Sequence, residues 1–309
     1  MTTTSAPQHR AHCDARIEFV NGGSLTAEAF RIDLPGDLAP ADADEAAVGR
    51  LLVRHLGLAL VESVAIANLR VVEEAHRGSR GIDPTPTAEP GRLVDLSHTI
   101  RDGLVTYPGL PAPTIAPHLT RADSRSHYVA GTEFALDTIT MLGNTGTSLD
   151  SPFHRYEGGT DLAGLALETL VDQRAEVFHL ADASARGIRE AVFFDRDVTG
   201  RAVLLHTGWD RHFGTPAYAH GAPFLAEDGA AYLVSQGVTL VGIDSLNIDD
   251  TESGGSRPAH SLLLEAGIHV VEHLTSLDEL PPSGALFTAV PPRVADFGTF
   301  PVRAYARLL

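Results

Sequence analysis

The sequence contains no lysine, so all 23 residues in the combined lysine and arginine count are arginines. Schiff-base catalysis, lysine-bound pyridoxal phosphate and the P-loop all depend on a lysine amine, and the composition excludes these enzyme classes. Cysteine is almost as scarce, because Cys13 is the only one in 309 residues. A single thiol excludes a disulfide framework within the chain and a cysteine-ligated metal centre, and it suits a reducing compartment.

Long apolar runs are also missing. The best candidate, residues 56–69, is broken by Glu62, Ser63 and Asn68 and falls short of the ~20 apolar residues of a membrane helix. Residues 1–10 lack the apolar segment of a signal peptide, so we expect a cytoplasmic protein. The formal net charge of -17 argues against nucleic acid or an anionic membrane as partner, because both would be repelled. The expected partner is a small molecule.

The chain divides into four parts at the level of sequence. Residues 1–15 are expected to be a disordered lead, and residues 16–81 a small α+β unit. Three prolines within residues 82–92 predict a stiff linker, because proline cannot occupy a helix interior or a central strand. The remainder, residues 93–309, is expected to be the catalytic domain.

The small unit has a clear pattern of elements. Asn21, Gly22 and Gly23 separate two β-rich runs and predict a hairpin, because these residues tolerate a positive φ. A helix is expected at about residues 44–55, with Asp42 or Asp44 as its N-cap, followed by a strand at 60–73. An accessory packing role is favoured for this unit over a substrate cover or an oligomerisation arm.

The larger part alternates strands with helices. Apolar runs at 174–180, 202–206 and 238–244 have the length of buried strands, and residues 226–236 are expected to form a helix that ends at Gly237. This alternation indicates an α/β core.

One stretch, residues 142–156, reads L-G-N-T-G-T-S-L-D-S-P-F-H-R-Y. It resembles the signature H-x-G-T-H-x-D-x-P-x-H of the cyclase family, which includes bacterial kynurenine formamidase and isatin hydrolase. Residues 93–109 and 257–274 resemble the opening and the downstream motif of the same family. The resemblance therefore covers nearly everything after residue 93, and it implies a swivelling β/β/α domain and a homo-oligomer.

The resemblance also implies a set of metal ligands, which this sequence keeps only in part. Asn144 and Ser148 stand where the family has two metal-binding histidines. Amide and hydroxyl oxygens bind zinc or manganese less well than imidazole does. The resemblance leaves Asp150, His260 and Glu272 as ligands for one divalent metal ion, and the alternative is that none is bound.

His154 falls on the family's acid/base position. Histidine exchanges a proton near neutral pH, so the resemblance makes His154 the catalytic acid/base, with Asp150 beside it. Asn144 and Ser148 are candidates to hydrogen-bond the substrate. The alternative is that they only fill the space of the missing histidines.

Three other patterns are set aside. Residues 269–273 spell H-x-x-E-H, but the β-branched residues between them favour a strand over the helix that an inverse-zincin motif needs. Ser148, Asp150 and His154 are close in sequence, but no G-x-S-x-G elbow supports a serine hydrolase. The acidic run at residues 244–252 does not match a calcium loop and is expected to be a solvated loop.

Together these features favour an enzyme of the hydrolase type that opens an amide or lactone of a small cyclic or acyl-bearing metabolite. A metal at Asp150, His260 and Glu272 would activate water, and His154 would carry the proton to the leaving group. The second hypothesis is a metal-independent cyclase or dehydratase of secondary, polyketide-like metabolism. The third is a non-catalytic protein that binds a small molecule.

Overall fold

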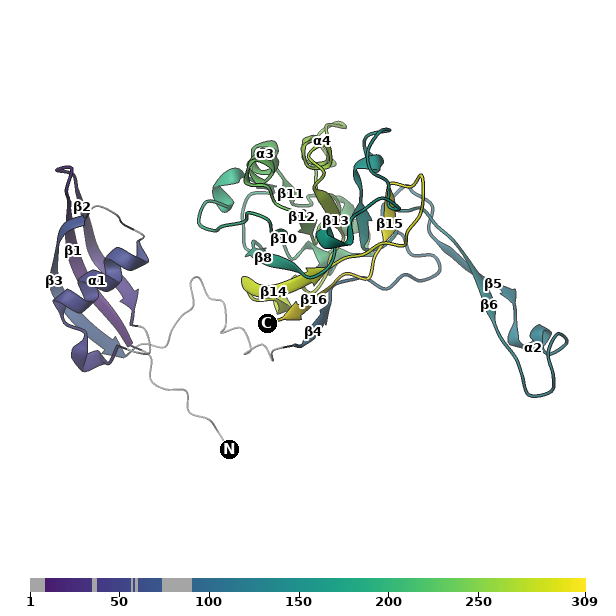
Figure 1. Cartoon of the computed structure of the whole chain (residues 1–309), viewed down its shortest axis with the longest axis horizontal. Helices are drawn as coiled ribbons and strands as arrows, with labels where there is room; N and C mark the ends of the chain where they lie inside the picture. The colour runs from purple at the N-terminus through teal and green to yellow at the C-terminus, as the bar shows by residue number, and fades with distance from the viewer. Residues whose placement is uncertain (1–8, 35–37, 57, 59–60, 74–90) are drawn as a thin grey trace. The chain divides into compact units, whose positions relative to one another are not determined.

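The computed structural model describes residues 9–34, 38–56, 58, 61–73 and 91–309. The chain forms two compact units, residues 1–84 and 85–309 (Figure 1). Most of the predicted linker, residues 82–90, and residues 1–8 of the predicted lead lie outside the described residues. Residues 9–15 belong to a strand, so the prediction of disorder is wrong there.

The small unit is a three-stranded antiparallel sheet with one helix. The strands are β1 (His9–Phe19), β2 (Ser24–Asp33) and β3 (Val61–Glu73), in the order β2-β1-β3. The predicted hairpin is confirmed, with Gly22 at φ +83° in its turn. Helix α1 comprises Glu45–His55. Asp44 precedes it and serves as its N-cap, because the carboxylate accepts a hydrogen bond from the amide of Ala47 at 2.7 Å.

Alternation along β1 explains why the helix packs on this sheet. Every second residue points to one face, and on β1 the buried residues are Ala11, Cys13, Ala15 and Ile17. They join Val48 and Leu52 of α1 in one apolar cluster. Because Cys13 is buried in this core, its thiol acts as a small apolar side chain.

The large unit is built on a nine-stranded sheet that curls into a half-barrel (Figure 1). Its four central strands are parallel, namely β8 (Gln173–His179), β10 (Ala202–His206), β12 (Leu240–Ile243) and β13 (His269–Glu272). Antiparallel β7 (Ser148–Asp150) and β15 (Thr299–Pro301) follow beyond β13. Antiparallel β14 (Ser283–Thr288), β16 (Tyr305–Leu308) and β4 (Leu93–Asp95) follow beyond β8.

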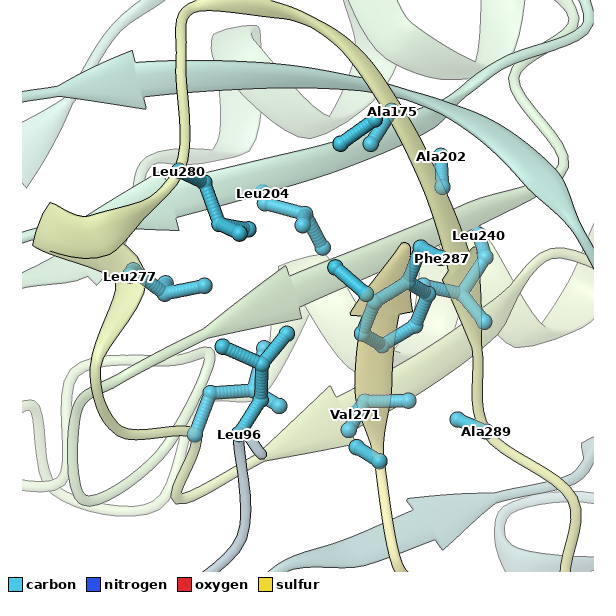
Figure 2. Close-up of a cluster of buried hydrophobic side chains, with 14 of the residues drawn as sticks. Leu96, Ala175, Ala202, Leu204, Leu240, Val271, Leu277, Leu280, Phe287 and Ala289 are labelled. Carbon is cyan, nitrogen blue, oxygen red and sulfur yellow. The ribbon is translucent and has the colours of Figure 1, made fainter. Parts of the chain in front are cut away.

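Both faces of this sheet are covered by apolar side chains. One face packs on α3 (Glu227–Gln236) and α4 (Pro258–Glu265), and Val270 belongs to this cluster. The other face holds a second cluster that includes Leu204, Val271 and Phe287 (Figure 2). Gly242 of β12 leaves room for the neighbouring core side chains, because a Cβ there would come within 2.7 Å of Leu274 and 2.8 Å of Leu204. The predicted α/β core is therefore confirmed.

A two-stranded arm leaves the large unit between β4 and β7. It consists of β5 (Thr114–Leu119), the short helix α2 (Arg121–Ser124) and β6 (Leu136–Thr140), and it extends away from the sheet (Figure 1). Several large apolar side chains on it are exposed: Tyr128, Val129, Phe134, Leu136 and Ile139. An isolated two-stranded hairpin is marginally stable in water, so this arm is expected to pack against something further.

Shorter elements lie between the helices and strands named above. They are the strand pair β9 (Gly187–Ile188) and β11 (Phe224–Leu225) and the 3-10 helices η1 (Pro40–Asp42), η2 (Pro152–His154), η3 (Leu167–Thr169), η4 (Glu190–Val192), η5 (Trp209–His212), η6 (Pro216–Ala219) and η7 (Leu277–Glu279). None of the helices in the described residues has the length and apolar character needed to cross a membrane.

Strand β13 confirms that the H-x-x-E-H run does not form a helix, and it buries two histidines of that run. His269 is 5% exposed and hydrogen-bonds Thr169 through Nε2 at 2.9 Å, while His273 is 1% exposed and hydrogen-bonds the Tyr218 hydroxyl through Nδ1 at 2.9 Å. Burial lowers the pKa of His269 to about 4 and that of His273 to about 3. Both rings are therefore neutral in the folded protein at neutral pH.

We expect these two histidines to destabilise the fold in mild acid. A pKa below the unfolded value means that the unfolded chain binds more protons, so stability is lost as the pH falls from about 6.5 toward 4. Each buried histidine contributes a slope of up to ~1.4 kcal/mol per pH unit. Urea unfolding at pH 7 and pH 5 measures the change.

The variant His269→Gln provides the test. Glutamine cannot bind a proton, so the variant loses one of the two groups that take up a proton on unfolding. Its free energy of unfolding should therefore fall by less than that of the parent over the same pH interval. His220→Gln, at an exposed histidine, is the matched control and should keep the parental pH dependence. Equal slopes in the parent and His269→Gln would contradict the assignment.

Candidate active site

The register of three strands assembles the first part of the site. Strand β7 lies between β13 and β15, and the pairing aligns Thr299, Asp150 and Val270 in one row. The next row on the same face aligns Ser148 with Glu272. Side chains directly opposite in antiparallel strands share a face, and Val270 faces the helices. The side chains of both rows therefore project toward the helices.

Helix α4 brings His260 to this face. The helix begins with Pro258, whose fixed φ favours the first turn. Asp249, in the loop after β12, accepts hydrogen bonds from the amides of Ala259 at 2.7 Å and His260 at 3.0 Å. The same carboxylate lies 2.7 Å from Nδ1 of His260. Asp249 therefore holds both the start of the helix and the orientation of the imidazole.

Two more carboxylates converge on the other nitrogen of this ring. His260 Nε2 lies 3.3 Å from Asp150 Oδ2 and 3.5 Å from Glu272 Oε1. Glu272 also accepts from the amide of Ile248 at 2.7 Å. All four ionisable side chains of this group are buried, with at most 7% of each residue exposed.

Burial and hydrogen bonding raise the pKa of Glu272 and His260 and lower that of Asp150. Burial raises the pKa of Glu272 to about 8, since the charged form loses its hydration. Burial would lower the pKa of His260, but hydrogen bonds to Asp150 and Asp249 outweigh it and raise that pKa to about 10. Burial likewise opposes ionisation of Asp150, yet its bonds to His260 and Thr299 and the nearby His154 lower its pKa. Protons on His260 and Glu272 thus reduce the negative charge of the cluster.

His154 stands at the open side of the same group. It ends η2, directly after β7, and its side chain is exposed. The Thr299 hydroxyl lies 2.7 Å from His154 Nδ1 and 2.6 Å from Asp150 Oδ1, so one hydroxyl joins the two residues. A Cβ at position 298 would lie 2.5 Å from the Cα of His154, and only glycine permits this approach.

The donor set fits a divalent metal ion. Asp150, His154 and His260 offer ligand atoms that all lie within 4.8 Å of one another. In a tetrahedral zinc site with bonds of about 2.1 Å, neighbouring ligand atoms are about 3.4 Å apart. The separations of His260 Nε2 from Asp150 at 3.3 Å and from Glu272 at 3.5 Å agree with that spacing. Imidazole and carboxylate ligands suit zinc or manganese.

The two proposed substrate-binding residues lie differently. Ser148 is 1% exposed, and its hydroxyl has no hydrogen-bond partner within the described part of the chain. It is aligned with Glu272 across the β7–β13 pair. Asn144 is half-buried and lines a small cavity together with Thr106 and Tyr107. Both remain predictions, and the unpartnered hydroxyl of Ser148 favours contact with a ligand.

Two residues of the site, Asp249 and Thr299, were not predicted from the sequence. The acidic run at residues 244–252 was expected to be a solvated loop, and this is wrong for Asp244 and Asp249, which are buried and accept hydrogen bonds. The available signal was position, because this run follows a buried parallel strand, and ligands in α/β sheets bind beyond the carboxyl ends of strands. Thr299 gave no signal, since only the pairing of β15 with β7 brings it to Asp150.

Comparisons with known proteins agree with this architecture. The family model described as "Putative cyclase" matches residues 94–250. A kynurenine formamidase of Geobacillus thermodenitrificans is 29% identical over 214 residues, covering 69% of this chain and 96% of that protein. A kynurenine formamidase of Bacillus cytotoxicus is 26% identical over 216 residues, covering 70% and 97%.

Solved structures show the same fold. A potential metal-dependent hydrolase with cyclase activity superposes with a TM-score of 0.57 at 26% identity, covering 70% of this chain and 96% of that one. Isatin hydrolase A from Ralstonia solanacearum superposes with a TM-score of 0.59 at 22% identity, covering 71% and 92%. The family model spans the strand and turn that carry Asp150 and His154. The chain belongs to the cyclase family, and its relatives are hydrolases.

Proposed function

We propose that the protein is a hydrolase that opens an amide or lactone of a small cyclic or acyl-bearing metabolite. The observation that carries the proposal is the placement of Asp150 between two histidines. Its Oδ2 faces His260 at 3.3 Å, and its Oδ1 is joined through Thr299 to His154. Relatives that are hydrolases support the reaction class.

We assign the metal ligands to Asp150, His260 and Glu272. These three side chains are buried, and His260 Nε2 lies 3.3 Å from Asp150 and 3.5 Å from Glu272, whereas His154 is exposed. A buried ligand set suits a resident ion, and an exposed imidazole suits proton exchange with a bound substrate. A divalent ion such as zinc or manganese supplies Lewis acidity, which polarises a carbonyl oxygen and activates water.

His154 performs the proton transfers in this proposal. Its ring accepts a proton from the attacking water and donates it to the leaving nitrogen or oxygen, so that the bond to the carbonyl carbon breaks without release of a strong base. Asp150 stabilises the positive charge on the ring through the Thr299 hydroxyl. Asn144 and Ser148 are the residues that we propose to hydrogen-bond the substrate.

The protonation of the buried cluster favours a second candidate function. His260 and Glu272 have raised pKa values, so both hold a proton at neutral pH and the negative charge of the three carboxylates is reduced without a metal ion. A metal-independent cyclase or dehydratase of secondary metabolism would use these proton donors and His154 for acid/base chemistry. Metal content separates the two candidates, because only the hydrolase proposal needs an ion for activity.

We expect at most one tightly bound divalent ion per chain. Asn144 and Ser148 replace two imidazoles, and affinity follows the type and number of ligands. Elemental analysis of protein purified without chelator measures the stoichiometry. Asp150→Asn should lose the ion, and the double variant Asn144→His, Ser148→His should take up more metal than the parent. Two equivalents in the parent would refute the single site.

We expect His154→Asn to slow turnover by ~10²- to 10⁴-fold, the usual contribution of general acid/base catalysis. Asparagine keeps a similar volume but cannot carry a proton, so folding should be nearly unchanged. The assay uses a panel of aryl formamides, cyclic imides and lactones, with His220→Asn as a control at an exposed histidine outside the site. Near-parental turnover by His154→Asn would move the acid/base role to His260 or Asp150.

We also propose that the protein is a homo-oligomer that buries the apolar side chains of the arm. Light scattering should give a mass above the 32.8 kDa of one chain. The double variant Phe134→Ser, Ile139→Ser should shift the mass toward the monomer, because both side chains are more than half exposed, at 53% and 54%. Phe194→Ser, at a residue 60% exposed outside the arm, is the control. A monomeric parent would contradict this proposal.

A further inference from the structure

We infer that Thr299 is a positioning residue that fixes which ring nitrogen of His154 carries the proton. The inference rests on the proposed function in taking His154 as the proton carrier. Thr299 is 5% exposed, and its hydroxyl lies between the Asp150 carboxylate and the His154 ring. Thr299 therefore contacts the acid/base residue from a buried position.

The direction of the two hydrogen bonds follows from the chemistry of the three groups. A hydroxyl has one proton to donate, and an ionised carboxylate only accepts. Thr299 Oγ1 lies 2.6 Å from Asp150 Oδ1, so the hydroxyl proton points to the carboxylate. Donation to His154 instead would leave two oxygen lone pairs facing each other at that distance.

The state of the imidazole is then determined. Because the hydroxyl proton is used, Thr299 accepts from His154, and the 2.7 Å contact is Nδ1–H donating to Oγ1. In a neutral imidazole one nitrogen holds the proton and the other a lone pair. The lone pair therefore lies on Nε2, which is free to accept a proton from water. The opposite tautomer would place a hydrogen on Nε2 and block this role.

The surrounding backbone keeps the three groups at these distances. Thr299 is paired with Asp150 in the β15–β7 register. The carbonyl of Gly298 accepts from the amide of Ser151 at 2.8 Å and from its hydroxyl at 3.0 Å. These bonds tie the start of β15 to the turn that carries His154. In a serine-protease triad the carboxylate contacts histidine directly and sets its tautomer, and here a hydroxyl stands between them.

Two substitutions isolate the hydroxyl. Thr299→Val keeps the shape of the side chain and removes the hydroxyl, whereas Thr299→Ser keeps the hydroxyl. The direct readout is ¹⁵N NMR of histidine-labelled full-length protein, with the His154 signals identified by their loss in His154→Asn. The parent and Thr299→Ser should show the proton on Nδ1, and Thr299→Val should shift it toward Nε2.

Turnover and metal content complete the test. Thr299→Val should lower kcat by ~10- to 100-fold with little change in KM, and Thr299→Ser should recover most of it, since the tautomer affects only part of the general acid/base contribution. Zinc content should be the same in all three proteins. Thr288→Val, at a threonine 4% exposed outside the site, controls for loss of a buried hydroxyl.

The outcomes separate this inference from the proposed function. A parental protein with the proton on Nε2 would overturn the role of Thr299, and this measurement needs no substitution at Thr299. Thr299→Val with the parental tautomer and parental turnover would also overturn it. If His154→Asn keeps full activity, the acid/base role proposed for His154 fails, while the NMR result still decides whether Thr299 sets the tautomer.

Discussion

Three buried carboxylates that converge on one imidazole are the constraint on which the rest of the site depends. Asp150, Asp249 and Glu272 cannot all be ionised side by side in a low-dielectric interior unless positive charge lies among them. His260 supplies that charge when protonated, and a divalent ion can supply it instead. Protons and a divalent ion would compete for the same ligand atoms, so metal binding at this site would depend on pH.

The fold brings these groups together through sheet pairing and one helix. Short strand β7 has partners on both sides, so its single carboxylate, Asp150, is aligned with Thr299 across one pair and lies near Glu272 across the other. Helix α4 packs on the same face of the sheet as these side chains. Asp249 fixes where that helix begins by accepting hydrogen bonds from its first turn. Residues up to 149 positions apart in sequence therefore meet within hydrogen-bond distance.

Local pattern was enough to predict several elements of the fold, and the architecture of the large unit was expected from resemblance to a family. The hairpin at Asn21 to Gly23, helix α1 and strands β3, β8 and β10 were expected within about two residues of their observed bounds, because turn chemistry and apolar periodicity are local properties. The grouping of Asp150, His154 and His260 was expected from resemblance to a family. Asp249 and Thr299 were not, because their roles depend on strand register and on the loop beyond β12, neither of which is visible in a short window of sequence.

The close contact at Gly298 couples the mobility of two distant segments. Because no side chain separates this glycine from the backbone of His154, the turn after β7 and the start of β15 have to move as one body. A displacement of the C-terminal strands would carry the histidine with it, whereas the buried cluster around His260 is anchored separately by α4. The position of the His154 backbone is thus coupled to the last strands of the chain.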